Sequence, residues 1–197
     1  MRYSVENGAL IIEYVAVPKA KTPISLTNHS YFNLDGFGGD IKSHKAIIYA
    51  ENYSEVNERL IPTGEHPSVF GTRFDFTEPH EIGERIGGDF IGYDHNFILK
   101  PKTTKVFAER EIALAAEVFG KSLVMKTYTD QPGIQLYIGN FLGEGPNFKG
   151  GIKQIRHGAF CIEAQTEPNS VNHGIGIYDA GEVYTQTTVY EIEKIKD

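Results

Sequence analysis

The chain has 197 residues, which is long enough for one domain with its own core. Hydrophobic residues make up 40% of it and charged residues 23%, proportions that are typical of folded globular proteins and not of disordered chains. The formal net charge of −7 repels phosphate backbones and anionic lipid headgroups, so we expect neither nucleic acid nor a membrane surface as a partner. We expect a single domain over residues 1–197.

The sequence also favours a cytoplasmic protein. No segment approaches membrane-spanning length, and Glu13 interrupts the apolar run ALIIEYVAV near the N-terminus. The one cysteine, Cys161, cannot form an internal disulfide, which fits a reducing compartment.

The apolar pattern has a period of two residues through most of the chain, as half-buried strands require. Turn clusters such as DGFGGD, KPKTT and GEGPNFKGG separate the alternating runs, and only residues 78–86 could hold a short helical turn. Many short strands with frequent turns predict an all-β fold, built as an antiparallel sandwich. The expected strands, in chain order, are residues 9–17, 24–34, 45–50, 96–100, 110–119, 122–130, 133–141, 160–165 and 183–192.

The stretch TNHSYFNLDG contains the first candidate functional residue, His29. If residues 24–31 are extended, Thr27, His29 and Tyr31 lie on one polar face. Histidine changes its charge near neutral pH, so His29 is a candidate for proton transfer. The alternative is a histidine that is simply satisfied by its polar neighbours.

Glu163 is the second candidate, because it lies in the middle of the uncharged strand FCIEAQ. Burying an unpaired carboxylate costs several kcal/mol, roughly, or raises its pKa. A functional role is one interpretation of this placement. A strand face open to water, or a structural ion pair, is the other.

Two further polar residues lie close to turns. Asp94 in GYDHNF follows a glycine turn, where aspartate most often caps backbone amides. Gln135 alternates with Gly133 and Tyr137, which leaves an open patch beside its amide.

Metal and nucleotide motifs do not occur. The seven histidines include no pair at HxH or HxxxH spacing, and Cys161 has no CxxC partner. No GxGxxG, GxxxxGK[ST] or GxSxG motif is complete. We expect no metal and no organic cofactor, and we expect Cys161 to be a small buried hydrophobe.

Six segments together resemble the aldose 1-epimerase, or galactose mutarotase, family: PISLTNHSYFNL, LIPTG, GTRFDF, GYDHNFIL, QPGIQLYIGNFL and FCIEAQTEPNSVN. They follow one another from residue 23 to residue 172. The resemblance implies a large β-sandwich and a cofactor-free interconversion of the α and β anomers of free hexoses such as galactose or glucose. It implies His29 as general acid and Glu163 as general base. It also places Ser30, Tyr31, Asp94 and Gln135 at the substrate.

The implied chemistry explains why these residue types are needed. Opening a pyranose removes the proton of the C1 hydroxyl while the ring oxygen is protonated, and the aldehyde then turns about the C1–C2 bond before the ring recloses. Reference pKa values of about 4.3 for glutamate and 6.5 for histidine leave a window in which the base is ionised and the acid protonated.

The sequence departs from the family in one respect. Family members carry a long N-terminal half, with an NHLHGG-like segment and a sugar-binding arginine that this chain does not contain. A sandwich without those strands exposes apolar faces and unpaired edges, which predicts self-association or a companion chain that supplies them. The alternative to an enzyme is a non-catalytic carbohydrate-binding or degenerate mutarotase fragment. A phosphosugar epimerase would need a basic cluster that we do not find.

Overall fold

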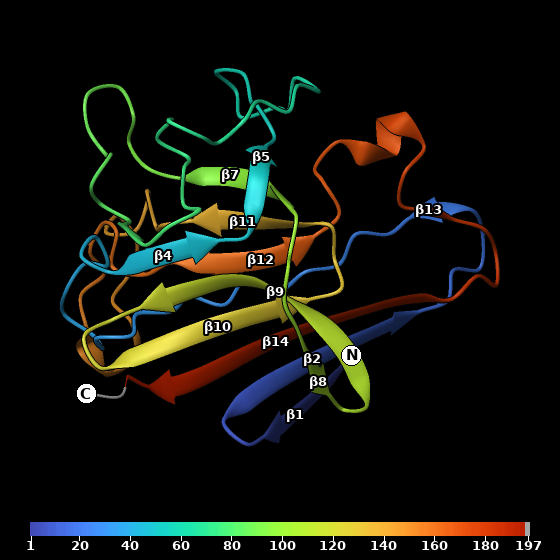
Figure 1. The fold of residues 1–197 in the computed structure, drawn as a ribbon, viewed down its shortest axis with the longest axis horizontal. Helices are drawn as coiled ribbons and strands as arrows, with labels where there is room; N and C mark the ends of the chain where they lie inside the picture. The colour runs from blue at the N-terminus through green and yellow to red at the C-terminus, as the bar shows by residue number, and fades with distance from the viewer. Residues whose placement is uncertain (196–197) are drawn as a thin grey trace.

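The computed structural model describes residues 1–195, which form fourteen strands and two short 3-10 helices (Figure 1). The prediction of an all-β, antiparallel fold is confirmed. No helix in this part of the chain is long and apolar enough to cross a membrane. The elements are β1 (Arg2–Glu6), β2 (Ala9–Ala16), β3 (Thr22–Pro23), β4 (Lys45–Ile48), β5 (Ala50–Tyr53), β6 (His80–Glu81), β7 (Asp94–Leu99), β8 (Thr104–Phe107), β9 (Arg110–Phe119), β10 (Leu123–Thr129), β11 (Gly133–Tyr137), η1 (Lys149–Gly151), β12 (Cys161–Gln165), η2 (Ser170–His173), β13 (Ile177–Tyr178) and β14 (Tyr184–Lys194).

The strands form two main sheets (Figure 1). The larger sheet has the order β1-β2-β14-β10-β9-β4-β6, with β8 also paired to β9, and the smaller has the order β12-β11-β7-β5. The short strands β13 and β3 pair with each other. All of the pairings between these strands are antiparallel.

The main hydrophobic core contains side chains from both sheets. Met125 and Tyr190 of the larger sheet belong to the same buried cluster as Leu136 and Ile162 of the smaller one. Because side chains alternate along a strand, the residues next to these in β11 and β12 point to the opposite face of the smaller sheet. Each fully buried large apolar side chain contributes about 1.5–3 kcal/mol, so this core fixes which face of the smaller sheet is left open.

The expected strands at residues 9–17, 110–119, 122–130 and 183–192 correspond to β2, β9, β10 and β14. The expected strand at residues 45–50 is instead divided between β4 in the larger sheet and β5 in the smaller one. At the division, the Tyr49 amide donates to the Ala115 carbonyl while the Tyr49 carbonyl accepts from Lys100. The chain turns a corner of the sandwich here, which is how strands pass from one layer to the other.

The prediction of a strand at residues 24–34 is wrong. The segment is extended, but its backbone hydrogen bonds are isolated and do not form a ladder. The Ile24 amide donates to the Gly176 carbonyl, and Phe32 exchanges two hydrogen bonds with Phe160. Between these points the Leu26 amide donates to the hydroxyl of Tyr184. Side chains of another strand therefore replace the ladder that the alternating pattern predicts.

The sequence allows a short helical turn at residues 78–86, and the structure has two hydrogen-bonded turns there but no helix. His80–Glu81 form β6 and pair with β4, and the fully buried Ile82 donates its amide to the His44 carbonyl. Gly83 then donates to Lys42, whose side chain leaves no room for a Cβ at the glycine. Burial of Ile82 and these backbone hydrogen bonds hold the segment at the sheet edge.

Candidate active site

The outer face of the smaller sheet, which points away from the core, carries a group of polar side chains. The register places Tyr137 of β11 opposite both Asp94 and Cys161, and Gln135 opposite both Asn96 and Glu163. Directly opposed residues on one face lie close enough for their side chains to interact. The outer-face residues are Asp94 and Asn96 of β7, Gln135 and Tyr137 of β11, and Cys161, Glu163 and Gln165 of β12.

His29 reaches this face from the extended segment beside β12, which is an edge strand of the smaller sheet. The paired backbone bonds between Phe32 and Phe160 hold one end of the segment. The Tyr190 hydroxyl donates to the Ile162 carbonyl at 2.6 Å and lies 2.9 Å from Asn28 Oδ1, immediately before the histidine. These anchors direct the His29 side chain over β12.

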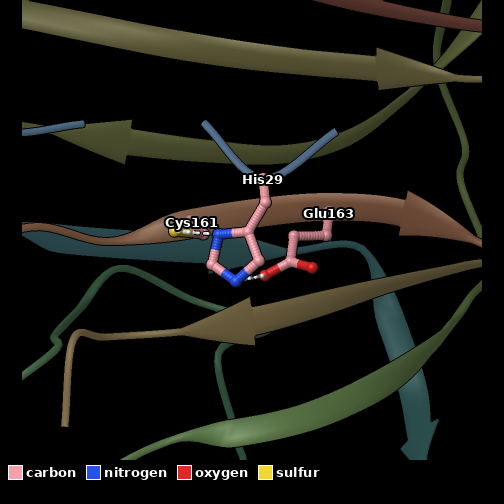
Figure 2. A group of neighbouring side chains, drawn as sticks. All are labelled: His29, Cys161 and Glu163. Atoms are coloured by element: carbon pink, nitrogen blue, oxygen red, sulfur yellow. Dashed lines mark hydrogen bonds and ion pairs between the residues drawn. The ribbon is translucent and has the colours of Figure 1, made fainter. Parts of the chain in front are cut away.

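The imidazole of His29 lies between two side chains of β12 (Figure 2). Its Nε2 is 3.4 Å from Glu163 Oε1, and its Nδ1 is 3.5 Å from Cys161 Sγ. The His29 side chain is 52% exposed and that of Glu163 only 11%, so a bound molecule could reach the imidazole directly and the carboxylate from one side.

Aromatic rings enclose the imidazole. Tyr31 stacks on His29 with ring centroids 4.9 Å apart, and Tyr137 meets His29 edge-on at 5.9 Å. Burial raises the pKa of both tyrosines, so their hydroxyls stay neutral over the physiological range. Together they form an apolar wall with polar tips, a surface suited to the face of a sugar ring.

Burial raises the pKa of Glu163, and the nearby Asp94 adds to this effect, while His29 opposes it. The net direction is upward, which makes Glu163 a stronger base than an exposed glutamate. Burial also raises the pKa of the Cys161 thiol, with Glu163 and Asp94 acting in the same direction. The thiol therefore stays protonated.

A chain of hydrogen bonds crosses the floor of the site. Gln135 Nε2 donates to Asp94 Oδ1 at 2.8 Å, and Gln165 Nε2 lies 3.2 Å from both Gln135 Oε1 and Asn96 Oδ1. Asn96 Nδ2 in turn donates to Ser54 Oγ at 2.9 Å. Because each member restrains the next, the floor is held in one arrangement before any ligand binds.

These side chains line a cavity of about 450 Å³, a volume typical of small-molecule sites. Five of the six sequence-predicted site residues line it: His29, Tyr31, Asp94, Gln135 and Glu163. Ser30 is half-buried and does not line it. Asp94 begins β7, and its carboxylate accepts a hydrogen bond from the Gln135 side chain.

Sequence reasoning missed several lining residues. Asn96, Tyr137 and Gln165 share the faces of Asp94, Gln135 and Glu163, so extending the two-residue alternation would have found them. Ser54, Leu60, Pro62 and Pro168 also line the cavity. They lie outside the strands of the smaller sheet, and no local pattern marks them.

His29, Cys161 and Glu163 could also be considered as a metal centre, because their ligand atoms lie within 4.8 Å of one another. The geometry argues against this interpretation, since the thiol and the carboxylate face different nitrogens of the imidazole. A metal also needs the thiolate, which the raised pKa of Cys161 disfavours. The three residues fit a hydrogen-bonded acid and base better than a metal site.

Comparison with known proteins identifies the family of this chain. The family model described as aldose 1-epimerase matches residues 1–191. The chain belongs to the aldose 1-epimerase family. A galactose mutarotase from Sus scrofa is 41% identical over 191 residues, covering 94% of this chain, and an aldose 1-epimerase from Escherichia coli is 34% identical over 173 residues, covering 85%.

Solved structures of the aldose 1-epimerase family share the fold. A galactose 1-epimerase from Lactobacillus acidophilus superposes with a TM-score of 0.83 at 26% identity, covering 98% of this chain and 56% of that one. An aldose epimerase homologue from C. elegans gives 0.84 at 25% identity, with 98% and 59% covered. The chain spans about half the length of the curated relatives it matches: 54% of the Sus scrofa protein and 49% of the Escherichia coli one.

Proposed function

We propose that this chain carries an aldose 1-epimerase site that interconverts the α and β anomers of free hexoses such as galactose or glucose. The observation that carries the proposal is the pairing of His29 Nε2 with Glu163 Oε1 at 3.4 Å inside a polar cavity. Both reacting oxygens of a pyranose are bonded to C1, so an acid and a base this close together can serve them at the same time.

Glu163 acts as the general base and His29 as the general acid. The ionised Glu163 removes the proton of the C1 hydroxyl as protonated His29 gives the proton on Nε2 to the ring oxygen, so the bond between C1 and the ring oxygen breaks. The free aldehyde turns about the C1–C2 bond. On reclosure His29 takes its proton back, and Glu163 returns its own to the carbonyl oxygen. No net proton is gained or lost.

The remaining polar residues hold the sugar. Asp94 and Gln135 supply acceptors and a donor to its hydroxyls, and the bond between them restrains both side chains. Tyr31 and Tyr137 supply aromatic surface on the same side as the imidazole. Aromatic rings beside hydrogen-bonding groups are a common arrangement in concave small-molecule sites.

The alternative is a carbohydrate-binding fragment without catalysis. This alternative is a candidate because about half of the length of the curated relatives has no counterpart in this chain. The two functions share the binding floor and differ in whether Glu163 and His29 move protons.

The polarimetric change of freshly dissolved α-D-galactose distinguishes them. Catalysis predicts acceleration over buffer that is lost in both Glu163→Gln and His29→Asn. If the chain does not accelerate the change but binds galactose by calorimetry, the binding module is the correct interpretation.

A further inference from the structure

Cys161 is in contact with His29, yet the proton transfers above do not use it. Its side chain is fully buried, and its sulfur lies 3.5 Å from His29 Nδ1, the nitrogen that points away from Glu163 (Figure 2). Cys161 and Glu163 are two residues apart in β12, so the strand's alternation puts both on the same face. One short strand thus contacts both nitrogens of a single imidazole.

The acid step places a requirement on the nitrogen that does not react. Protonated imidazole carries a proton on each nitrogen, and after Nε2 gives up its proton the remaining one must stay on Nδ1. A hydrogen-bond acceptor at Nδ1 meets this requirement, and it also stops the ring from turning about its bond to Cβ. The only side-chain atom that the described structure pairs with Nδ1 is the Cys161 sulfur.

The kind of acceptor matters as well. A carboxylate at Nδ1 would stabilise the imidazolium strongly, as in triads where a buried aspartate holds the histidine. A thiolate would do the same by forming an ion pair that retains the proton. A neutral thiol is only a weak acceptor, so it orients the ring while leaving the Nε2 proton free to move.

We propose that Cys161 is a positioning residue whose neutral sulfur accepts the Nδ1 proton of His29, so that Nε2 is the only nitrogen exchanging protons with the substrate. The proposal rests on the proposed function, because it assigns the acid to His29. The thiol stays neutral because burial, Glu163 and Asp94 all oppose its ionisation. The groups that face the imidazole are Glu163 and Cys161 of β12, Tyr137 of β11 and Tyr31 of its own segment.

The proposal predicts different effects for two substitutions. Cys161→Ala removes the acceptor, so kcat should fall by about tenfold or more while KM for galactose stays within twofold, since small misplacements of a catalytic group cost up to about 100-fold. Cys161→Ser restores an acceptor stronger than sulfur. It should recover part of kcat and move the alkaline limb of the kcat profile to higher pH, because the imidazolium is held more firmly.

A readout independent of activity is the exchange of the His29 Nδ1 proton with water, measured by NMR. At a pH where the ring is protonated, this proton should be protected in the wild-type chain, stay protected in Cys161→Ser and exchange faster in Cys161→Ala. Ile162→Val is the matched control, because it removes buried volume on the opposite face of β12 and should leave both the exchange rate and the pH profile unchanged.

The outcomes separate this inference from the proposed function. If the wild-type chain does not accelerate mutarotation, the exchange rate of the Nδ1 proton in Cys161→Ala still decides whether the sulfur holds Nδ1. If Cys161→Ala does not fold, the alkaline limb and the exchange rate of Cys161→Ser decide it. A wild-type Nδ1 proton that exchanges as fast as that of a free imidazolium, or a Cys161→Ala variant with an unchanged exchange rate and kcat, would overturn the proposal.

Discussion

Gln135 donates a hydrogen bond of 2.8 Å to Asp94, which joins β11 to β7 diagonally across the floor of the site. The bond occupies one carboxylate oxygen of Asp94 and leaves the other for a ligand. The same carboxylate raises the pKa of Glu163. Under the proposed function, Asp94 therefore links sugar binding to the strength of the base.

Asp94→Asn tests this link. Removing the negative charge should lower the pKa of Glu163, so the acid limb of the kcat/KM profile should move to lower pH. Sugar affinity should fall by roughly tenfold, the value of one hydrogen bond to a charged group. Gln135→Leu is the control. It should weaken sugar binding, but it keeps the negative charge of Asp94 and should leave the acid limb of the kcat/KM profile in place. An acid limb that stays fixed in Asp94→Asn would contradict the link.

Glu163→Gln should raise stability at neutral pH. The folded-state pKa of Glu163 lies above its unfolded value, so the folded chain holds this proton more tightly and loses stability as pH rises through that interval. Glutamine does not ionise and avoids the loss. The Tm of Glu163→Gln should exceed that of wild type at pH 8, and the two should converge below about pH 4, near the reference value for glutamate. Glu58→Gln, on an exposed loop, should show no such pattern, and an equal Tm difference at both pH values would refute the prediction.

The chain should lose stability in mild acid because of a buried histidine. His95 packs against Phe74, with ring centroids 4.7 Å apart, and burial lowers its pKa to about 4. The unfolded chain takes up this proton at about pH 6.5, so stability falls as pH drops from there to about 4, by about 3 kcal/mol from this residue. Urea unfolding at pH 7 and pH 4.5 measures the loss.

His95→Phe should show a smaller loss between the two pH values than wild type. Part of the loss should remain, because burial also lowers the pKa of His44 and of His157. An identical pH dependence in His95→Phe and wild type would show that His95 does not titrate in this way.

The purified chain should associate with itself or with a chain that supplies further strands. Tyr3 and Val5 of β1 lie opposite Ile12 and Leu10, so they share the core-facing side of the larger sheet, yet they are 57% and 77% exposed. Exposed apolar residues on an edge strand favour pairing with another chain. Sedimentation at micromolar concentration should show species larger than a monomer, reduced by Val5→Lys and unaffected by Val171→Lys in η2, which lies outside the sheets. A monodisperse monomer would contradict the prediction.

Much of the fold could be predicted because alternation is a local property of strands. The runs that became β2, β9, β10, β12 and β14 each place apolar side chains in the main core, and the same alternation correctly put Glu163 on the face opposite Ile162. The family resemblance assigned roles to five residues that line one cavity, four of which the local pattern had already singled out.

The segment around His29 could not be predicted from alternation alone. It has the pattern of a strand, but its partners are the hydroxyls of Tyr184 and Tyr190, more than 150 positions away in the chain. The division between β4 and β5 likewise depends on contacts with Ala115 and Lys100. Long-range hydrogen bonds decide both features, and a local pattern does not contain them.

The most direct test of the central claim is the rate of α-D-galactose mutarotation by Glu163→Gln, measured beside wild type and at saturating sugar. Loss of a positioned general base should reduce kcat by roughly 10²- to 10⁴-fold while galactose affinity by calorimetry is retained. A wild-type chain that accelerates the reaction, together with a Glu163→Gln variant within twofold of its rate, would contradict the assignment of Glu163 as the base.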